Sequence, residues 1–352
     1  MENAGFDVRR LDGAGNAAFD SDLPSSNARN SYDQRNLDPG VLLLHANPPQ
    51  IPYLFLTLGK RFIAQKYVIG YSVWELPKIP ADWRQNLRFV HRVWCPSEFS
   101  AQAFRSETDK LVQVVPHAIE PDSATKPNRG KFGISSGALV VLNALHLGSG
   151  LTRKNPLAAI RAFKSAFGGS DRALLLVKVS QSEFYPDRLR RIEDEIAGAP
   201  NIRVLTATLS DRDYWTLLHS IDAVLSPHRS EGFGLVTAQA MAVGKVAIAT
   251  GWSGNMEYMT PENSLLLDYR LVSVQDPEGN YQTDGQEWAE PDTEHAAQPL
   301  RRVAFDNAMR QRIGTAAARS VRSRLSRKVV TQKICDRLAE LGVRPSLDRR
   351  KI

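Results

Sequence analysis

The sequence predicts an α/β protein with two doubly wound parallel sheets, one in each half of the chain. Short apolar runs alternate with segments of helical periodicity. A stretch rich in Lys, Pro, Gly and Ser interrupts this alternation at 126–137, after which it starts again. Alternating strands and helices are typical of parallel sheets, whose ligands bind beyond the carboxyl ends of the strands. The residues at those ends are therefore the candidates for a ligand site.

The elements of the N-terminal half follow from its apolar runs. Residues 1–40 are expected to be largely irregular, because 13–40 is rich in Asn, Asp, Ser, Gly and Pro. Four buried strands are predicted after it, at 41–45, 67–73, 92–95 and 111–115. Helical stretches are predicted at 82–90 and 97–104. Together these segments form a first predicted domain, 1–125, and 126–137 is the predicted linker.

The C-terminal half repeats the pattern more fully, over a second predicted domain, 138–300. Its predicted strands are 138–145, 173–179, 202–205, 223–226 and 245–250. Its predicted helices are 155–167, 187–196, 211–219 and 235–243. Residues 272–292 are polar and expected to be irregular, and 294–300 and 308–338 are expected to be helical.

Composition excludes several classes of protein. The chain has 352 residues, of which 42% are apolar and 24% charged, which excludes a collagen and a chain disordered throughout. No apolar run approaches the roughly 20 residues that cross a bilayer, and the polar N-terminus predicts no signal peptide. Cys95 and Cys335 are the only cysteines, which favours a reducing cytoplasm over a disulfide framework.

Charge is distributed unevenly. The formal net charge is +7, but residues 301–352 hold 15 Lys/Arg and 4 Asp/Glu, so the rest of the chain is close to neutral. No nucleic-acid-binding motif accompanies the basic residues, and we expect no nucleic-acid partner. The basic helical segment 301–352 predicts contact with an anionic membrane surface. A solvated helix face is the alternative interpretation.

The most informative motif joins a strand to a helix at 226–242. Glu231 is followed by Gly-Phe-Gly and then by a predicted helix. Glycines let a ligand approach the backbone, and a helix N-terminus suits a diphosphate. Gln239 follows Glu231 by eight residues, about 12 Å along a helix, which matches the hexose-to-ribose span of a nucleotide sugar. The alternative interpretation is a tight turn with an acidic helix start.

Other strand ends add to this motif. Arg153 and Lys154 would supply the positive charge that a departing diphosphate needs, unless they are a solvated basic pair. The turn at 250–258 would line the same cleft, or Ser253 or Asn255 would cap a helix there. Glu75 ends a strand of the first half and would bind acceptor or sugar, or lie on the surface.

Some strand ends carry weaker signals, and several catalytic motifs are missing. His45 and His117 end strands, although a lone histidine is more often structural. The sequence lacks a phosphate-binding loop of the Walker type, a nucleophile elbow and a His-Glu-x-x-His zinc motif. We therefore expect neither a kinase nor a serine hydrolase, and no metal site.

Together the motifs resemble glycosyltransferase family 4, the retaining nucleotide-sugar transferases of the GT-B fold. The resemblance covers roughly residues 41–325 and is strongest at 228–235, 153–156 and 249–255. Residues 74–77 and 93–97 look like matching segments of the N-terminal domain. The chain is most similar to bacterial branches that build lipopolysaccharide or exopolysaccharide. The resemblance implies two Rossmann-like domains facing a cleft.

The resemblance also implies roles for individual residues. Glu231 would contact the donor sugar, Lys154 and Arg153 would hold the diphosphate, and Glu75 would replace the family's cleft histidine. Further donor-side residues would be Gly232, Phe233, Gly234, Leu235, Gln239, His228, Ser149 and Asn255. Acceptor-side residues would be His45, Trp74 and His117. Gln239 replaces the ribose-binding glutamate of the family, but it can still hydrogen-bond a hydroxyl.

The chain departs from the family at its start, where members have a strand, a glycine-rich loop and a helix. The first residues here look like the end of that helix, so we expect an incomplete N-terminal domain. The resemblance implies metal-independent, cofactor-free transfer of a hexose from a GDP- or UDP-linked donor to a saccharide or lipid-linked acceptor. The expected location is the cytoplasm or the inner face of its membrane. Alternatives are a non-catalytic GT-B partner subunit and a nucleotide-sugar epimerase.

Overall fold

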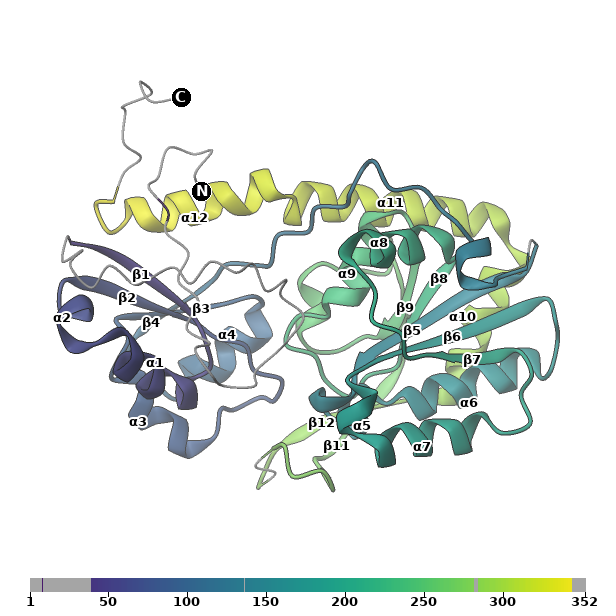
Figure 1. Cartoon of the computed structure of the whole chain (residues 1–352), viewed down its shortest axis with the longest axis horizontal. Coiled ribbons are helices and arrows are strands. Elements are labelled where there is room, and N and C mark those ends of the chain that lie inside the picture. Colours follow the sequence, from purple (N-terminus) through teal and green to yellow (C-terminus); the bar gives the residue numbers. More distant parts are fainter. Residues whose placement is uncertain (1–7, 9–38, 136, 282–283, 344–352) are drawn as a thin grey trace.

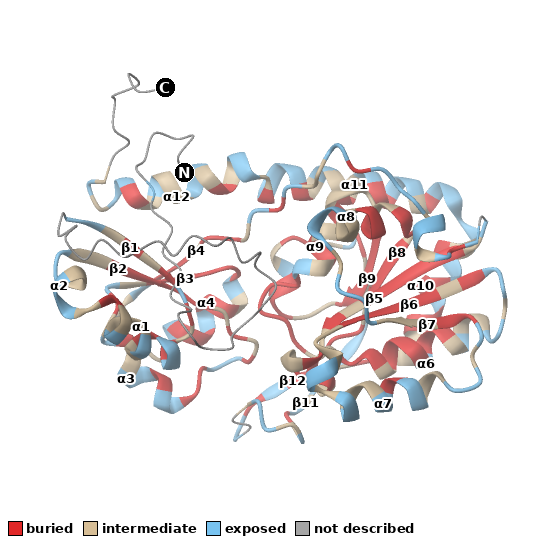
Figure 2. Cartoon of the chain, viewed as in Figure 1, coloured by how far each residue is buried: buried red, intermediate tan, exposed pale blue. Residues whose placement is uncertain are grey.

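The protein folds into two α/β halves that lie side by side, each around its own parallel sheet (Figure 1). The computed structural model describes residues 8, 39–135, 137–281 and 284–343. The irregular structure predicted for 1–40 falls almost wholly outside the described residues. Buried residues concentrate on the strands and on the inward faces of the helices (Figure 2).

The first half contains a four-stranded sheet in the order β1-β2-β3-β4, and all its pairs are parallel. Its strands are β1 (Gly40–His45), β2 (Lys66–Tyr71), β3 (Arg92–Cys95) and β4 (Leu111–Val114). They confirm the four predicted runs to within a few residues. Its helices are α1 (Ile51–Leu58), α2 (Lys60–Ile63), α3 (Arg84–Leu87) and α4 (Glu98–Arg105). Ser97 caps α4, because its side chain accepts a hydrogen bond from the Ser100 amide.

The second half contains a six-stranded parallel sheet in the order β10-β9-β8-β5-β6-β7. Its strands are β5 (Leu139–His146), β6 (Ala173–Ser180), β7 (Ile202–Leu205), β8 (Ala223–Ser226), β9 (Val246–Thr250) and β10 (Leu265–Leu267). The strand order reverses between β5 and β8, which is where ligands bind in open sheets of this type. The central strands β5 and β6 are mostly apolar and buried because helices cover both faces of the sheet.

Helices form a layer on each face of the second sheet. One layer holds α6 (Pro156–Phe167), α7 (Pro186–Ile196) and α10 (Thr293–Phe305), with Phe163, Ile192 and Leu300 in its core. The other holds α8 (Asp211–Ser220), α9 (Leu235–Ala242) and α11 (Asn307–Leu325). A single turn of helix, α5 (Leu151–Lys154), follows β5 at the carboxyl edge.

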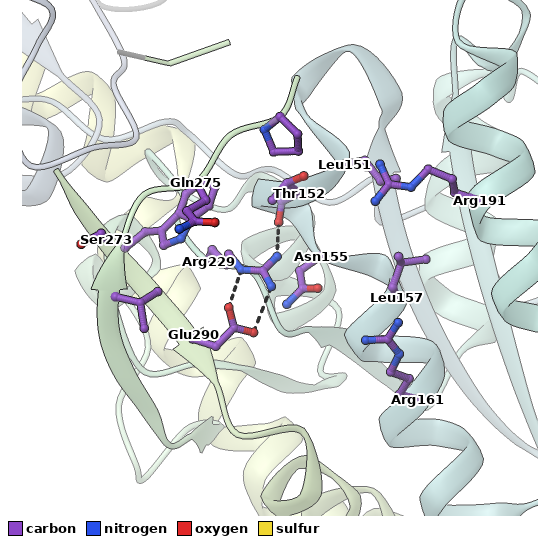
Figure 3. A pocket seen from close by; sticks show the side chains of 13 residues that line it. Leu151, Thr152, Asn155, Leu157, Arg161, Arg191, Arg229, Ser273, Gln275 and Glu290 are labelled. Carbon is purple, nitrogen blue, oxygen red and sulfur yellow. Dashed lines mark hydrogen bonds and ion pairs between the residues drawn. The ribbon is translucent and has the colours of Figure 1, made fainter. Parts of the chain in front are cut away.

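A hairpin stands where the sequence predicted irregular structure. Strands β11 (Tyr269–Ser273) and β12 (Glu287–Pro291) pair antiparallel, so the expectation for 272–292 was wrong at these strands, whereas 274–281 and 284–286 between them contain no helix or strand. The residues of β11 are mostly exposed, and its sequence carries no clear apolar alternation. Tertiary packing holds the hairpin, because Trp288 and Val274 enter the core of the first half. The hairpin also forms one wall of a cavity of about 570 Å³ (Figure 3).

The C-terminal helices join the two halves. The helix predicted for 308–338 is two helices, α11 and α12 (Arg327–Ala339), because Ser326 adopts an extended conformation between them. Helix α11 packs on the second half, and α12 returns to the first, where Val330 packs beside Trp94 (Figure 1). Arg92 of β3 binds Glu340 just after α12, with 2.9 Å between Nη1 and Oε2. Within the described residues, no helix is both long and apolar enough to span a bilayer.

Candidate active site

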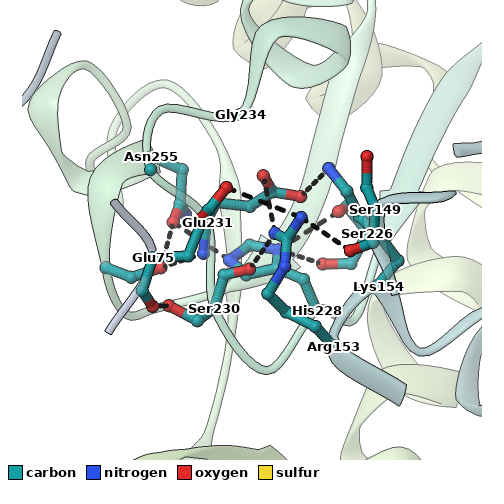
Figure 4. Close-up of polar contacts among 12 residues, drawn as sticks. Glu75, Ser149, Arg153, Lys154, Ser226, His228, Ser230, Glu231, Gly234 and Asn255 are labelled. Atoms are coloured by element: carbon teal, nitrogen blue, oxygen red, sulfur yellow. Dashed lines mark hydrogen bonds and ion pairs between the residues drawn. The ribbon is translucent and has the colours of Figure 1, made fainter. Parts of the chain in front are cut away.

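The carboxyl edges of the two sheets bring the predicted segments together. From the second half come α5, the loop between β8 and α9, and the turn after β9. From the first half comes the loop after β2, which carries Glu75. Figure 4 shows four charged side chains meeting there: Glu75, Arg153, Lys154 and Glu231. We refer to these four residues as the charged cluster.

Contacts within the charged cluster alternate between cations and carboxylates. Lys154 Nζ lies 2.6 Å from Glu231 Oε1, and Arg153 Nη1 lies 3.4 Å from Glu231 Oε2. Arg153 Nη2 lies 3.8 Å from Glu75 Oε1, across the boundary between the halves. Only 3% of the Arg153 side chain and 10% of the Glu231 side chain are exposed. The low exposure strengthens these interactions relative to surface ion pairs.

The two carboxylates of the charged cluster have different proton affinities. Burial by itself raises the pKa of Glu231, but the charges of Lys154 and Arg153 outweigh it and hold the pKa at about 2. Burial also raises the pKa of Glu75, and there the opposing charges do not overcome it. Glu231 is therefore a permanent anion, whereas Glu75 is the carboxyl suited to exchanging a proton.

Backbone carbonyls fix the Arg153 guanidinium. It donates to the carbonyl of Ser230 at 2.8 Å and to that of Ser149 at 3.0 Å. Ser149 thus holds Arg153 through its backbone. The Ser230 hydroxyl in turn donates to the carbonyl of Glu75, which ties the loop of the second half to that of the first. Arg153 Nε is buried and has no hydrogen-bond partner in the described part of the chain.

The glycine-bearing loop after Glu231 packs directly against the first half. The Ser97 hydroxyl donates to the Gly232 carbonyl at 2.6 Å. A Cβ on Gly232 would lie 2.3 Å from a methyl group of Val73, and one on Gly254 would lie 2.2 Å from the Gly232 carbonyl oxygen. Glycine is required at 254 because two backbones meet there. The Gly254 amide donates to the carbonyl of Glu231 at 2.8 Å.

The next residues anchor the start of α9. Gly234 is the N-cap of α9 with φ of 84°, a left-handed conformation that favours glycine. The Tyr258 hydroxyl donates to the Gly234 carbonyl at 2.6 Å. Phe233 is buried between the rings of Tyr258 and His117, at centroid distances of 5.2 and 5.0 Å. Leu235, by contrast, exposes 45% of its surface.

A buried histidine organises the loop beneath Glu231. His228 Nε2 lies 3.0 Å from Asn255 Oδ1, and Asn255 Nδ2 donates to the carbonyl of Thr250 at 2.9 Å. Burial lowers the pKa of His228, so the ring is neutral at pH 7. The Ser253 hydroxyl accepts a hydrogen bond from the Glu231 amide at 2.9 Å. These contacts orient Glu231 towards the two cations.

Gln239 and Trp74 lie outside the charged cluster. The side-chain oxygen of Gln239 accepts a hydrogen bond from the Tyr214 hydroxyl at 3.1 Å, which directs it towards α8. Trp74 is only 5% exposed and packs in the core of the first half, where its indole donates to the carbonyl of Lys78. The Trp74 indole N–H is thus engaged within the first half, and the Gln239 side-chain oxygen is engaged by Tyr214.

The two predicted acceptor-side histidines flank one tyrosine at the carboxyl edge of the first sheet. The rings of His45 and His117 lie 4.8 and 5.5 Å from that of Tyr71. The Tyr71 hydroxyl donates to the carbonyl of Val115 and lies 3.2 Å from His117 Nδ1. Burial lowers the pKa of both histidines, that of His117 to about 4. Both rings are therefore neutral at pH 7.

The structure adds residues that the sequence motifs did not single out. Tyr281, from the hairpin, packs on Trp74 at 5.3 Å between centroids and lies beside the Arg153 guanidinium. It falls in the polar stretch expected to be irregular, so no sequence signal identified it. Ser97 and Ser230 lie within quoted motifs, but the motifs did not indicate that they bridge the halves. In the described ranges, no group of His, Cys, Asp or Glu side chains is arranged to hold a metal ion.

Comparison with known families supports a carbohydrate-related role. The family described as "Glycosyl transferases group 1" matches residues 143–281, which run from β5 to the hairpin. This span contains Arg153, Lys154 and Glu231, and its match supports a glycosyltransferase function. The comparison with curated proteins gives no match.

Solved structures share the architecture. Anabaena HepE in complex with UDP and glucose is 16% identical with a TM-score of 0.66, over 85% of this chain and 78% of that one. A glycosyltransferase from Rickettsia africae is 15% identical with a TM-score of 0.64, over 86% and 77%. Sucrose-phosphate synthase from Thermosynechococcus elongatus is 15% identical with a TM-score of 0.64, over 86% and 74%. The chain therefore has the predicted GT-B fold.

Proposed function

We propose that this protein transfers a hexose from a nucleotide sugar to a saccharide or lipid-linked acceptor, with retention of anomeric configuration. The observation that carries the proposal is the charged cluster, which lies at the facing carboxyl edges of both sheets. Ligands of open α/β sheets bind at such edges. Three of its four residues lie in the span that matches the glycosyltransferase family.

In the proposed reaction, Arg153 and Lys154 neutralise the diphosphate as it leaves. Both now bind Glu231, so an incoming diphosphate would take over part of their hydrogen bonding while Glu231 turns to sugar hydroxyls. The acceptor oxygen forms a bond to the anomeric carbon as the bond from that carbon to the diphosphate oxygen breaks. The acceptor proton passes to the leaving diphosphate, and Glu75 is placed to assist because its pKa is raised.

The first donor to test is UDP-glucose. HepE, a structural neighbour, was crystallised with UDP and glucose, which makes the uridine donor the first choice for this chain. GDP-linked hexoses are the second choice. The charged cluster would contact the diphosphate and not the base, so it does not by itself select between UDP and GDP. We propose that transfer needs no metal ion, since two cations already face the position of the diphosphate. Activity should therefore survive EDTA.

Thermal shift and donor turnover test the proposal together. A nucleotide sugar present at 100 times its dissociation constant adds about 2.7 kcal/mol to stability, which shifts the melting temperature by several degrees. The shift and the release of UDP or GDP should both be lost in Lys154→Ala and Glu231→Ala. A cooperatively melting protein that shows neither with any UDP- or GDP-linked hexose would contradict the proposal.

That negative result would favour a second candidate, a non-catalytic GT-B protein that acts as a binding or partner subunit. Two observations favour this candidate. Gln239 is engaged by Tyr214, and the first half packs directly on Gly232, where a donor sugar would have to enter. Donor binding without turnover, measured with saccharide and lipid-linked acceptors, would separate a subunit of this kind from a transferase.

We further propose a position at an anionic membrane surface, in cell-surface polysaccharide synthesis. Helix α11 carries Arg312, Arg319 and Arg322 at spacings that place them on one exposed face. Such a face is attracted to anionic lipid head groups. It would bring the cleft close to a lipid-linked acceptor.

A further inference from the structure

A second polar cavity lies on the far side of α5 from the charged cluster. Its volume is about 570 Å³, within the range of small-molecule pockets. Leu151 and Thr152 of α5 line it, whereas Arg153 and Lys154 do not. Figure 3 shows it between the β11–β12 hairpin on one side and helices α6 and α7 on the other.

Three arginines from three separate elements line this cavity. Arg161 comes from α6, Arg191 from α7, and Arg229 from the loop after β8. Figure 3 shows the side chains of Arg161 and Arg191 extending from their helices towards the hollow. Glu290 is the acidic residue of the lining. The lining thus has a net positive charge, which favours an anionic ligand.

The arginines differ in how far they are already engaged. Arg229 Nε lies 2.7 Å from Glu290 Oε2, and Arg161 Nη2 lies 2.7 Å from Glu195 Oε2. For Arg191, no acidic partner exists among the residues that the structure describes. Its guanidinium therefore has donors to offer at the cavity.

An unpartnered amide belongs to the same lining. Asn155 follows α5 and is 6% exposed, and its Nδ2 has no hydrogen-bond partner in the described structure. A buried polar group without a partner destabilises the fold, because it loses its hydrogen bonds to water and gains none in return. The left-handed backbone of Asn155, with φ of 53°, explains the choice of asparagine but not the unused amide. An oxygen-rich ligand would satisfy it after a small side-chain rotation.

We propose that this cavity binds a phosphate-ester anion, at a site separate from the nucleotide-sugar cleft. Guanidinium groups suit phosphate because their forked N–H groups match its oxygens. Leu157, Val272 and Trp288 supply apolar walls for the organic part of the ester. The proposal does not depend on the glycosyltransferase function, because no side chain of the charged cluster lines the cavity.

Isothermal titration with glucose 6-phosphate, in a buffer free of phosphate and sulfate, tests the proposal on the full chain. Arg191→Glu and Asn155→Asp should each weaken binding at least about tenfold, because each places negative charge at the cavity. Arg190→Glu is the matched control: it makes the same charge change on α7, outside the lining. Arg190→Glu should bind glucose 6-phosphate as tightly as the unmodified chain does. Lys154→Ala should do so too, because Lys154 does not line the cavity.

Other outcomes decide against the proposal or identify the natural ester. Equal affinity of Arg191→Glu and the unmodified chain for glucose 6-phosphate would overturn the proposal. Loss of binding in Lys154→Ala would also overturn it, because that result would place the ester in the nucleotide-sugar cleft. Failure to bind up to about 10 mM would overturn it as well. If phosphatidic acid vesicles compete with glucose 6-phosphate for the cavity, the natural ester is a lipid head group. If the vesicles do not compete, the natural ester is a soluble molecule. Arg191 is exposed, so its variant tests the site even if Asn155→Asp misfolds.

Discussion

Lys154 Nζ and Glu231 Oε1 lie 2.6 Å apart, although 77 residues separate them in the sequence. The contact joins α5 to the loop after β8 at the carboxyl edge of the second sheet. Removal of one partner leaves a largely buried charge with fewer compensating contacts, which is costly. The pair therefore links the stability of the fold to the proposed chemistry.

Lys154→Ala should lower both stability and activity. We expect a loss of about 3 kcal/mol in the free energy of unfolding. Donor turnover should fall by about 10²-fold or more, because a group that stabilises the departing charge is removed. Chemical denaturation and UDP release measure the two effects. Lys333→Ala, on the exposed surface of α12, is the control; a Lys154→Ala enzyme with unchanged turnover would remove Lys154 from the mechanism.

Glu75→Gln should change the pH dependence of stability. The pKa of Glu75 is raised on folding, so the carboxyl favours the fold when protonated and loses that contribution as the pH rises above 4.5. The variant should thus melt higher than the unmodified chain at pH 7, and the difference should vanish below pH 4.5. Melting curves between about pH 4 and 8 check this. A difference that grows as the pH falls would contradict it.

Glu231→Gln should show the opposite pattern. The pKa of Glu231 is held at about 2, below its ordinary value of 4.5, so its charge stabilises the fold above pH 4.5. That stabilisation is lost as the pH falls towards 2. The unmodified chain should melt higher than Glu231→Gln at pH 7, and the gap should close in acid. Equal melting temperatures at pH 7 would show that the contacts to Lys154 and Arg153 contribute little.

Gly254→Ala should severely destabilise the protein. Its new methyl group would lie 2.2 Å from the carbonyl oxygen of Gly232, so two backbone segments would have to separate. We expect a loss of about 3 kcal/mol, the upper end of the range for overpacked cores, because the clash is with backbone. Gly130→Ala is the control, because its nearest neighbour would be 3.6 Å away. Thermal melting compares the two, and a mild effect at 254 would show that the loop can shift.

Tyr281 tests the contribution of the hairpin to the cleft. Tyr281→Phe keeps the ring that packs on Trp74 but removes the hydroxyl beside Arg153, so stability should hold while turnover falls several-fold. Tyr281→Ala removes both, and should also change the tryptophan fluorescence as Trp74 loses its cover. Equal turnover in all three proteins would leave Tyr281 with a packing role only.

Reversing the charge of Arg312, Arg319 and Arg322 should abolish binding to anionic vesicles. Unmodified protein should float with vesicles at low salt and be released as salt rises, because the attraction is electrostatic. A control that reverses Arg88, Arg172 and Arg190, on other elements, should still float. Flotation that is unaffected by the α11 changes would contradict a membrane role for this face.

The sequence predicted most of the sheet strands and the meeting of Arg153, Lys154 and Glu231 at one edge of the second sheet; for Glu75 it left open whether the side chain faces the cleft or the surface. Apolar runs bounded by Pro or Gly predict buried strands directly from the sequence. The carboxyl ends of parallel strands lie at the same edge of a sheet, so residues that follow such strands come together. The roles of these residues stay predictions. The orientation of Gln239 towards Tyr214 was not predictable, because a motif gives a position along the chain but not a rotamer or a neighbour.

Other elements were missed because tertiary contacts determine them. The hairpin exists because Trp288 reaches the core of the first half, and nothing in the local pattern of 272–292 reports that distant partner. The end of α11 at Ser326 lies within a continuous helical periodicity. Helix α1 was not among the predicted helices; it has a proline in its first turn, where proline is tolerated because the N–H it lacks would have no partner in the helix.

Helix α12 has a consequence for synthesis of the protein. The first sheet buries Tyr71 and Trp94 against Val330 and Leu338, residues made some 220 residues or more later. Until α12 has been synthesised, that face of the first half lacks its contacts with Val330 and Leu338. The first half precedes the second in the sequence but is completed only after α12 has been made, so its apolar face stays exposed longer during synthesis.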